Sequence, residues 1–158
     1  MTTSINGTTG VNLVQSGVIV AASVAASTLT PDKNNPSYFY AALAADVLLN
    51  NTANYFDGPG LTLGTGTWLV LAKAAVTDPT GNSGFYSKLW DGTTVYDSAI
   101  TTHPGINNFV TVNAAAIVVN PTGPVKISVR GVSSASGKIL ANQSGNSKDS
   151  SITAMRIG

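Results

Sequence analysis

The chain has 158 residues, of which 43% are hydrophobic and 9% are charged, and its formal net charge is +1. A chain of this length folds as one domain with a full core, and its apolar content excludes disorder by composition. Its Lys and Arg residues are scattered singly through the sequence, which argues against nucleic acid as the main partner because phosphate binding needs clustered basic side chains.

The polar residues favour strands and turns. All acidic residues are Asp, and the chain contains neither Glu nor Cys. Glu favours helices, whereas Asp favours turns and caps and Thr fits strands, so the composition predicts an all-β protein. A surface with so little charge also favours burial in an oligomer or a larger assembly.

Residues 1–36 differ from the rest because they contain no aromatic side chain. They mix small apolar residues with Thr, Ser, Asn and Gly, and they end in the turn-rich sequence "TPDKNNP". We expect an extended N-terminal arm that is ordered by packing on a partner. The apolar run at residues 18–26 has no preceding Lys or Arg and is too short to span a bilayer, so neither a signal peptide nor a membrane helix is expected.

Residues 37–158 read as a series of short strands separated by turns. Strands are expected within residues 37–51, 54–66, 67–76, 85–92, 93–100, 109–119, 125–132 and 151–158, with a short one around Ile139. Val125, Ile127 and Val129 alternate with polar residues, and residues 68–71 are apolar on both faces. Eight to ten antiparallel strands with turns every ten residues or so predict a sandwich, jelly roll or barrel.

The densest group of polar and aromatic side chains lies in "KLWDGTTVYDSA", residues 88–99. Asp91 and Gly92 lie between two segments in which apolar and polar residues alternate, which predicts a hairpin with a turn of two residues or slightly more. A turn with positive φ explains the presence of Asp91 without a functional site. Leu89 and Val95 are expected to share one face. Trp90 and Tyr96 are read either as packing anchors, the favoured interpretation, or as a ligand surface.

No catalytic or metal-binding motif is evident. The single His103 sits beside a Pro-Gly turn, there is no G-x-S-x-G elbow, and no Asp-rich calcium loop or phosphate loop is present. Paired Asp carboxylates leave a glycosidase open in principle, but nothing favours one. A carbohydrate platform on Trp68, Trp90 or Tyr96 is the alternative to core or interface packing. We therefore expect no cofactor and no enzymatic activity.

Several segments together are distinctive: "GTGTWLVLAKAAV", "KLWDGTTVYDSA", "VKISVRG" and "ILANQSGNSKDSSITAMRIG". They resemble a module of structural proteins of tailed bacteriophages, found in tail-fibre tips and small virion proteins, and "INGTTGVNLVQSG" resembles the segment that often precedes it. The resemblance covers nearly the whole chain. It implies a jelly roll like the trimeric complement and tumour-necrosis-factor heads, a homotrimer, a virion-structural role and no enzymatic activity.

The favoured hypothesis is a trimeric capsid decoration (cement) protein on the virion surface. Its arm, residues 1–36, would bind the major capsid protein by adding strand hydrogen bonds, and the jelly roll would occupy residues 37–158. The apolar arm residues proposed for this contact are Ile5, Val11, Leu13, Val14, Val18, Ile19 and Val20. The residues proposed for the trimer interface are Trp68, Leu69, Leu71, Met155 and Ile157.

The alternative hypothesis is a receptor-binding tip of a tail or head fibre. In that case the arm attaches to a fibre or baseplate protein, and Trp90 and Tyr96 stack on a bacterial surface glycan. A carbohydrate-active enzyme or a secreted lectin-like module is a third, weaker hypothesis. The sequence leaves open which virion surface is occupied, which loops face solvent and whether the arm exchanges between protomers.

Overall fold

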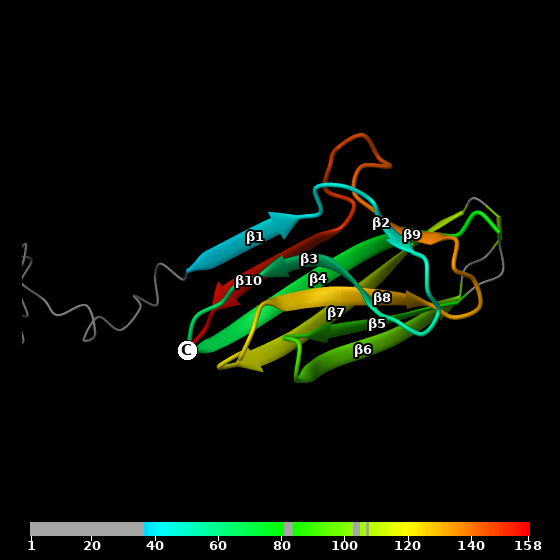
Figure 1. Ribbon diagram of the computed structural model, residues 1–158. Coiled ribbons are helices and arrows are strands. Elements are labelled where there is room, and N and C mark those ends of the chain that lie inside the picture. The colour runs from blue at the N-terminus through cyan, green and yellow to red at the C-terminus, as the bar shows by residue number, and fades with distance from the viewer. Residues whose placement is uncertain (1–36, 81–83, 103–104, 107) are drawn as a thin grey trace, which may run out of the picture. The chain divides into compact units, whose positions relative to one another are not determined.

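The computed structural model describes residues 37–80, 84–102, 105–106 and 108–158, and the regular structure of these residues consists of ten strands (Figure 1). Their bounds are β1 (Tyr38–Ala42), β2 (Val47–Leu49), β3 (Phe56–Leu61), β4 (Thr67–Thr77), β5 (Gly84–Trp90), β6 (Val95–Thr102), β7 (Phe109–Val119), β8 (Val125–Gly131), β9 (Gly137–Leu140) and β10 (Ser151–Arg156). All pairings between them are antiparallel, which confirms the predicted all-β class and strand number.

The strands form two sheets that pack face to face. Sheet A has the order β1-β10-β4-β7, and the short strands β9 and β2 extend it where β10 ends. Sheet B has the order β3-β8-β5-β6. From β3 onward the chain repeatedly crosses between the sheets, so sequence neighbours such as β3 and β4 lie in different layers. This is the winding of a jelly roll, to which β2 and β9 are additions.

The core lies between the sheets and is made by alternate residues of the long strands. β4 contributes Trp68, Val70, Ala72, Ala74 and Val76. From the other layer, β5 and β8 contribute the apolar side chains at alternate positions along each strand. The largest fully buried side chains are Phe85, Leu49, Leu89, Ile127, Ile139, Ile152, Val70, Val76, Val118, Val125 and Val129. This alternation leaves the opposite side chains of the same strands on the two outer faces.

One predicted strand is two in the structure. Residues 37–51 divide into β1, which pairs with β10, and β2, which pairs with β9. Between them the chain bends because Leu43 N–H donates to the Ser150 carbonyl and Asp46 Oδ1 accepts from Ala141 N–H. An apolar run alone does not show this change of partner, since both halves contain strand-forming residues.

The predicted arm, residues 1–36, lies outside the described residues, as does His103.

Candidate functional site

The outer face of sheet B carries alternating cationic and aromatic side chains. Cross-strand partners place Trp90 beside Lys126, Lys88 beside Ser128, and Tyr86 beside Arg130, all pointing away from the core. Tyr55, just before β3, joins them. We call this group the cation ladder; in order of contact it consists of Lys126, Trp90, Lys88, Tyr55, Arg130 and Tyr86.

Each cation of the ladder lies over aromatic rings. Lys88 Nζ is 3.1 Å from the Trp90 ring centroid and 4.5 Å from that of Tyr55. Lys126 Nζ is 5.4 Å from the Trp90 centroid. Arg130 Cζ is 5.4 Å from the Tyr55 centroid and 4.8 Å from that of Tyr86. These distances fall within the range of cation–π attraction, each contact contributing about 0.5–1 kcal/mol at an exposed site.

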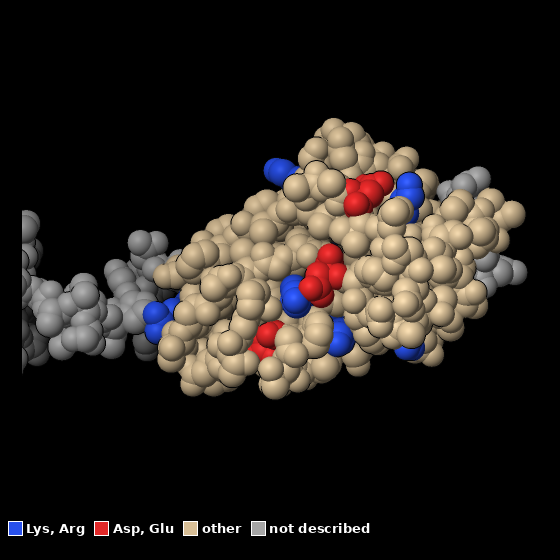
Figure 2. All heavy atoms as spheres, viewed as in Figure 1, with Lys and Arg blue, Asp and Glu red and all other residues tan. Residues whose placement is uncertain are grey.

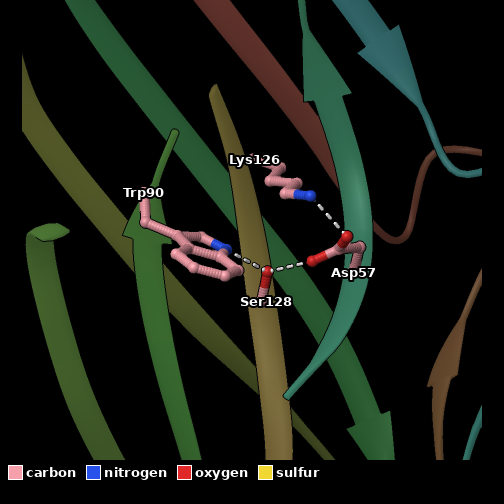
Figure 3. Close-up of polar contacts among 4 residues, drawn as sticks. All are labelled: Asp57, Trp90, Lys126 and Ser128. Carbon is pink, nitrogen blue, oxygen red and sulfur yellow. Dashed lines mark hydrogen bonds and ion pairs between the residues drawn. The ribbon is translucent and has the colours of Figure 1, made fainter. Parts of the chain in front are cut away.

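A chain of hydrogen bonds fixes one end of the ladder (Figure 3). Trp90 Nε1–H donates to the hydroxyl of Ser128 at 2.6 Å, and this hydroxyl donates to Asp57 Oδ1 at 2.6 Å. Asp57 Oδ2 pairs with Lys126 Nζ at 2.5 Å. Ser128 points outward but is fully buried beneath its neighbours. The orientation of the Trp90 ring is therefore set by three strands, β3, β5 and β8.

The ladder has more positive than negative charge. In the described parts of the chain, the Lys126–Asp57 contact is the single salt bridge. Burial lowers the pKa of the Lys88 ammonium, Asp57 opposes this effect, and Lys126 adds to it. Arg130 Nε is buried without a hydrogen-bond partner among the described residues. Figure 2 shows that charged residues are few and scattered on the face in view, most of which is uncharged.

The outer face of sheet A is apolar instead. Cross-strand partners align Tyr38, Met155, Leu69 and Ile117 in one row across β1, β10, β4 and β7. The next row contains Tyr40, Thr153, Leu71 and Ala115, and Val119 extends the surface along β7. Of the outward residues of these four strands, Lys73 is the one charged residue. We call this surface the apolar face.

Large side chains of the apolar face are open to solvent. Tyr38 is 64% exposed, Leu71 50%, Ile117 53% and Val119 55%. A shallow hollow of about 390 Å³ lies at its β7 side, lined by Leu71, Ala72, Asp97, Asn113, Ala114 and Ala115. Asp97 reaches this hollow from β6, and its Oδ2 accepts from Ala115 N–H at 2.9 Å. An exposed apolar surface spanning four strands is typical of a protein interaction site.

The structure brings some of the predicted interface residues together. Leu69, Leu71 and Met155 all belong to the apolar face, and Ile157 is 51% exposed just after β10. Trp68 does not belong to it. Its side chain is 3% exposed on the core side of β4, where it packs edge-on against Phe39 and its Nε1–H donates to the Gly64 carbonyl. Consecutive strand residues point to opposite faces, so Trp68 and Leu69 cannot share a surface.

The two residues of the predicted ligand surface are separated. Trp90 lies on the outer face, whereas Tyr96 packs against the core and its hydroxyl donates to Asp91. The predicted hairpin is present: its turn spans residues 91–94, Asp91 N–H donates to the Thr94 carbonyl, and the positive φ lies at Gly92. A register shift next to the turn leaves Val95 opposite Trp90, so Val95 and Leu89 do not share a face.

Asp91 is a buried hydrogen-bond hub. Its side chain accepts from the N–H groups of Thr93 and Thr94, from Tyr96 Oη–H, and from both N–H and Oγ1–H of Thr122. Burial by itself raises the pKa of the Asp91 carboxyl, but these donors outweigh it and hold the pKa well below its usual range. Burial and the Asp91 carboxylate raise the pKa of Tyr96 to about 12. Asp91 thus joins the β5–β6 turn to the loop after β7.

Sequence reasoning missed the ladder as a unit. The outward positions of β8 were predicted, and the same alternation in "FYSKLW" places Tyr86, Lys88 and Trp90 on one face of β5. Their pairing is a property of the sheet, and neither Tyr55 nor Asp57 shows a sequence signal for joining them.

Searches for other kinds of site returned nothing in the described ranges. No group of three or more His, Cys, Asp or Glu side chains there is placed to hold a metal ion. No described segment forms a helix of the length and hydropathy needed to cross a membrane.

Comparisons with known proteins identify no family. No family model and no curated protein matches the chain. Similar solved structures include the C-terminal CBM6 of the laminarinase LamC from Zobellia galactanivorans, with 17% identity over 77% of this chain and 100% of that one and a TM-score of 0.39. Eiger TNF from S. frugiperda matches with 10% identity over 77% and 85% of the chains and a TM-score of 0.43.

A third match is the carbohydrate-binding module CBM6cm-2 of Cellvibrio mixtus lichenase 5A, solved with cellotriose. Its identity is 9% over 73% of this chain and 99% of that one, with a TM-score of 0.33. At these identities and scores, none of the three matches bears on what this chain binds. The functional argument therefore rests on the two outer faces.

Proposed function

We propose that this chain is a non-enzymatic structural subunit that assembles as a homotrimer through the apolar face of sheet A. The exposed apolar surface across β1, β10, β4 and β7 is the observation that carries the proposal. Leu71 and Ile117 are each about half exposed, so covering the rest of either side chain would stabilise an assembly by about 1 kcal/mol, and each protomer offers several such side chains.

The layout of the apolar face favours a ring over a two-fold dimer. The exposed Tyr38 and Tyr40 lie at its β1 edge, and the hollow beside Leu71 and Ala115 lies at its β7 side. A contact between two different patches is heterologous, and closing it by rotation produces a cyclic assembly. The β1 edge of one protomer seated in the hollow of the next would give such an assembly, and the number of three copies rests on the resemblance of the sequence to trimeric phage modules.

Measuring native mass by sedimentation equilibrium tests the assembly. We expect a species of three times the 16.0 kDa chain mass that persists at micromolar concentration. A monomer at these concentrations would contradict the proposal. A dimer would retain the interface but contradict the heterologous arrangement.

We further propose that the trimer decorates the head shell of a tailed phage and binds the major capsid protein through residues 1–36. This part rests on the resemblance of the sequence to phage structural modules and on the low surface charge. Deleting residues 1–20 should leave the trimer intact and abolish binding to capsids. Full occupancy of shells by the truncated protein, counted by electron microscopy, would contradict the role of the arm.

The second candidate function is a fibre tip that recognises a bacterial surface glycan, and the cation ladder on the outer face of sheet B favours it. Cell-binding and capsid-binding assays on one preparation separate the two functions. Loss of cell binding in Trp90→Ala, with the trimer intact, would favour the fibre tip.

A further inference from the structure

Cations already lie over the aromatic rings of the ladder. Lys88 Nζ lies 3.1 Å from the centroid of the Trp90 ring, and Lys126 lies over the same ring at 5.4 Å. Tyr55 is shared by Lys88 and Arg130 in the same way. A neutral sugar that stacks on the face of Trp90 covered by Lys88 must displace an ammonium group that the ring attracts, which weakens stacking as the sole account of this surface.

The ladder presents positive charge to solvent at regular intervals. Lys126, Lys88 and Arg130 stand on three successive rungs of the β5–β8 pair, each about 7 Å from the next along the strands. Asp57 pairs with Lys126, whereas neither Lys88 nor Arg130 has a carboxylate partner in the described residues. The Asp57 carboxylate also acts on Lys88, but from beyond salt-bridge distance.

We propose that the cation ladder binds an acidic polysaccharide whose carboxylates pair with Arg130 and Lys88. This inference deepens the glycan-binding candidate above by naming its ligand class. Arg130 matches a carboxylate with two parallel hydrogen bonds, and Lys88 supplies a point charge one rung away. The hydroxyls of Tyr55 and Tyr86, which have no hydrogen-bond partner in the described residues, complement sugar hydroxyls.

Charge and rigidity both favour this class of ligand. Three cations on one face of a chain with net charge +1 suit a chain of spaced carboxylates better than the dense phosphates of nucleic acid, which need a wider basic surface. The Trp90–Ser128–Asp57 hydrogen bonds hold one end of the ladder in place before binding, which lowers the entropy lost on association.

Isothermal titration of the full chain with two forms of one polysaccharide tests the proposal. The probes are oligomers of polygalacturonate and the same oligomers fully methyl-esterified, which removes the charge and keeps the sugars. We expect binding of the acidic form that weakens with added salt, and at least tenfold weaker binding of the ester. Arg130→Met and Lys88→Met should each weaken acidic binding about tenfold.

Lys148→Met is the matched control, because it removes one positive charge from a loop away from the ladder. An equal loss in this variant, equal binding of single-stranded DNA, or no binding of the acidic oligomer would overturn the proposal. Equal binding of the ester would overturn the acidic class and leave the broader glycan-binding candidate standing. Native mass and denaturation midpoint, measured on each variant, distinguish these outcomes from failure to assemble or to fold.

Discussion

The outer faces of the two sheets are built by the same rule and have opposite chemistry. In both, alternate residues of long strands point away from the core. On sheet A these residues are Tyr38, Met155, Leu69 and Ile117 with their neighbours, whereas on sheet B they are the cations and aromatic rings of the ladder. One face therefore offers apolar area, as the proposed contact between protomers requires, and the other offers paired cations and rings, as the proposed acidic ligand requires.

Placing a charge on either face should give the sharpest contrast. Leu71→Asp puts a carboxylate in the middle of the apolar face, so we expect the trimer to dissociate to a 16.0 kDa monomer. Ile100→Asp is the matched control, because Ile100 is 65% exposed on β6 of sheet B and should leave the trimer intact. Sedimentation equilibrium distinguishes the two. Dissociation of both variants, or of neither, would show that sheet A holds no special interface.

Each sheet has a buried polar side chain that holds a connection between strands in place. Near sheet B this side chain is the charged Asp91, which joins the β5–β6 turn to Thr122. Asp91→Asn replaces an acceptor by an amide and leaves donors such as Thr122 N–H without a partner. We expect the free energy of unfolding to fall by about 2–4 kcal/mol in urea denaturation. A loss below about 0.5 kcal/mol would show that the Asp91 hub contributes little to the fold.

The same substitution should change the dependence of stability on pH. Because the pKa of Asp91 is lower in the folded than in the unfolded chain, its contribution is complete above the unfolded value of about 4 and is lost as the pH falls below it. The unfolding free energy of Asp91→Asn should therefore decrease less steeply than that of the unaltered protein between about pH 4 and pH 2. Parallel pH profiles would contradict the assignment.

The corresponding group in sheet A is neutral. Ser150 is fully buried where β9 gives way to β10; its Oγ–H donates to the Leu140 carbonyl, and Oγ accepts from Ala75 N–H. Ser150→Ala should cost about 1–2 kcal/mol because both backbone groups lose their partner. Unlike the Asp91→Asn loss, which should shrink between pH 4 and pH 2, this one should be the same at both pH values. A loss that varies with pH would mean that a titrating group elsewhere depends on Ser150.

The smallest effect is expected on the ladder. Lys88→Met keeps the apolar stem beside Trp90 and removes cation–π contacts that contribute about 1 kcal/mol, while it also relieves the burial of a charge. We expect the urea midpoint to change little. A large loss of stability would mean that the ladder maintains the fold and is not primarily a ligand surface.

The strand pattern could be read from the sequence because alternation and turn residues are local. Residues 109–119 and 125–131 were predicted closely because each is an uninterrupted strand between turn signals. Residues 37–51 were not, because the division between β1 and β2 depends on which strands lie beside them, β10 and β9, and these are far away in the sequence.

The candidate site was predictable only in part, for the same reason. Leu69, Leu71 and Met155 could be placed on an outward face from apolar residues on both sides of one strand. Trp90 and Tyr96 appear equivalent in "KLWDGTTVYDSA", yet a register shift turns Tyr96 towards Asp91 and leaves Trp90 outside. Residues 88–99 form a hairpin with a buried carboxylate, and Trp90 contacts Lys88, Lys126 and Ser128.

Composition and period-two alternation predict an all-β sandwich, jelly roll or barrel of short strands without clustered charge, because both act over a few neighbouring residues. Which outward residues meet depends instead on strand register, a property of the folded chain. Register between β5, β8 and the start of β3 brings Trp90, Lys126 and Asp57 together, and register across sheet A aligns Tyr38 with Ile117. Cross-strand pairing joins residues that lie tens of positions apart, and no local pattern encodes that distance.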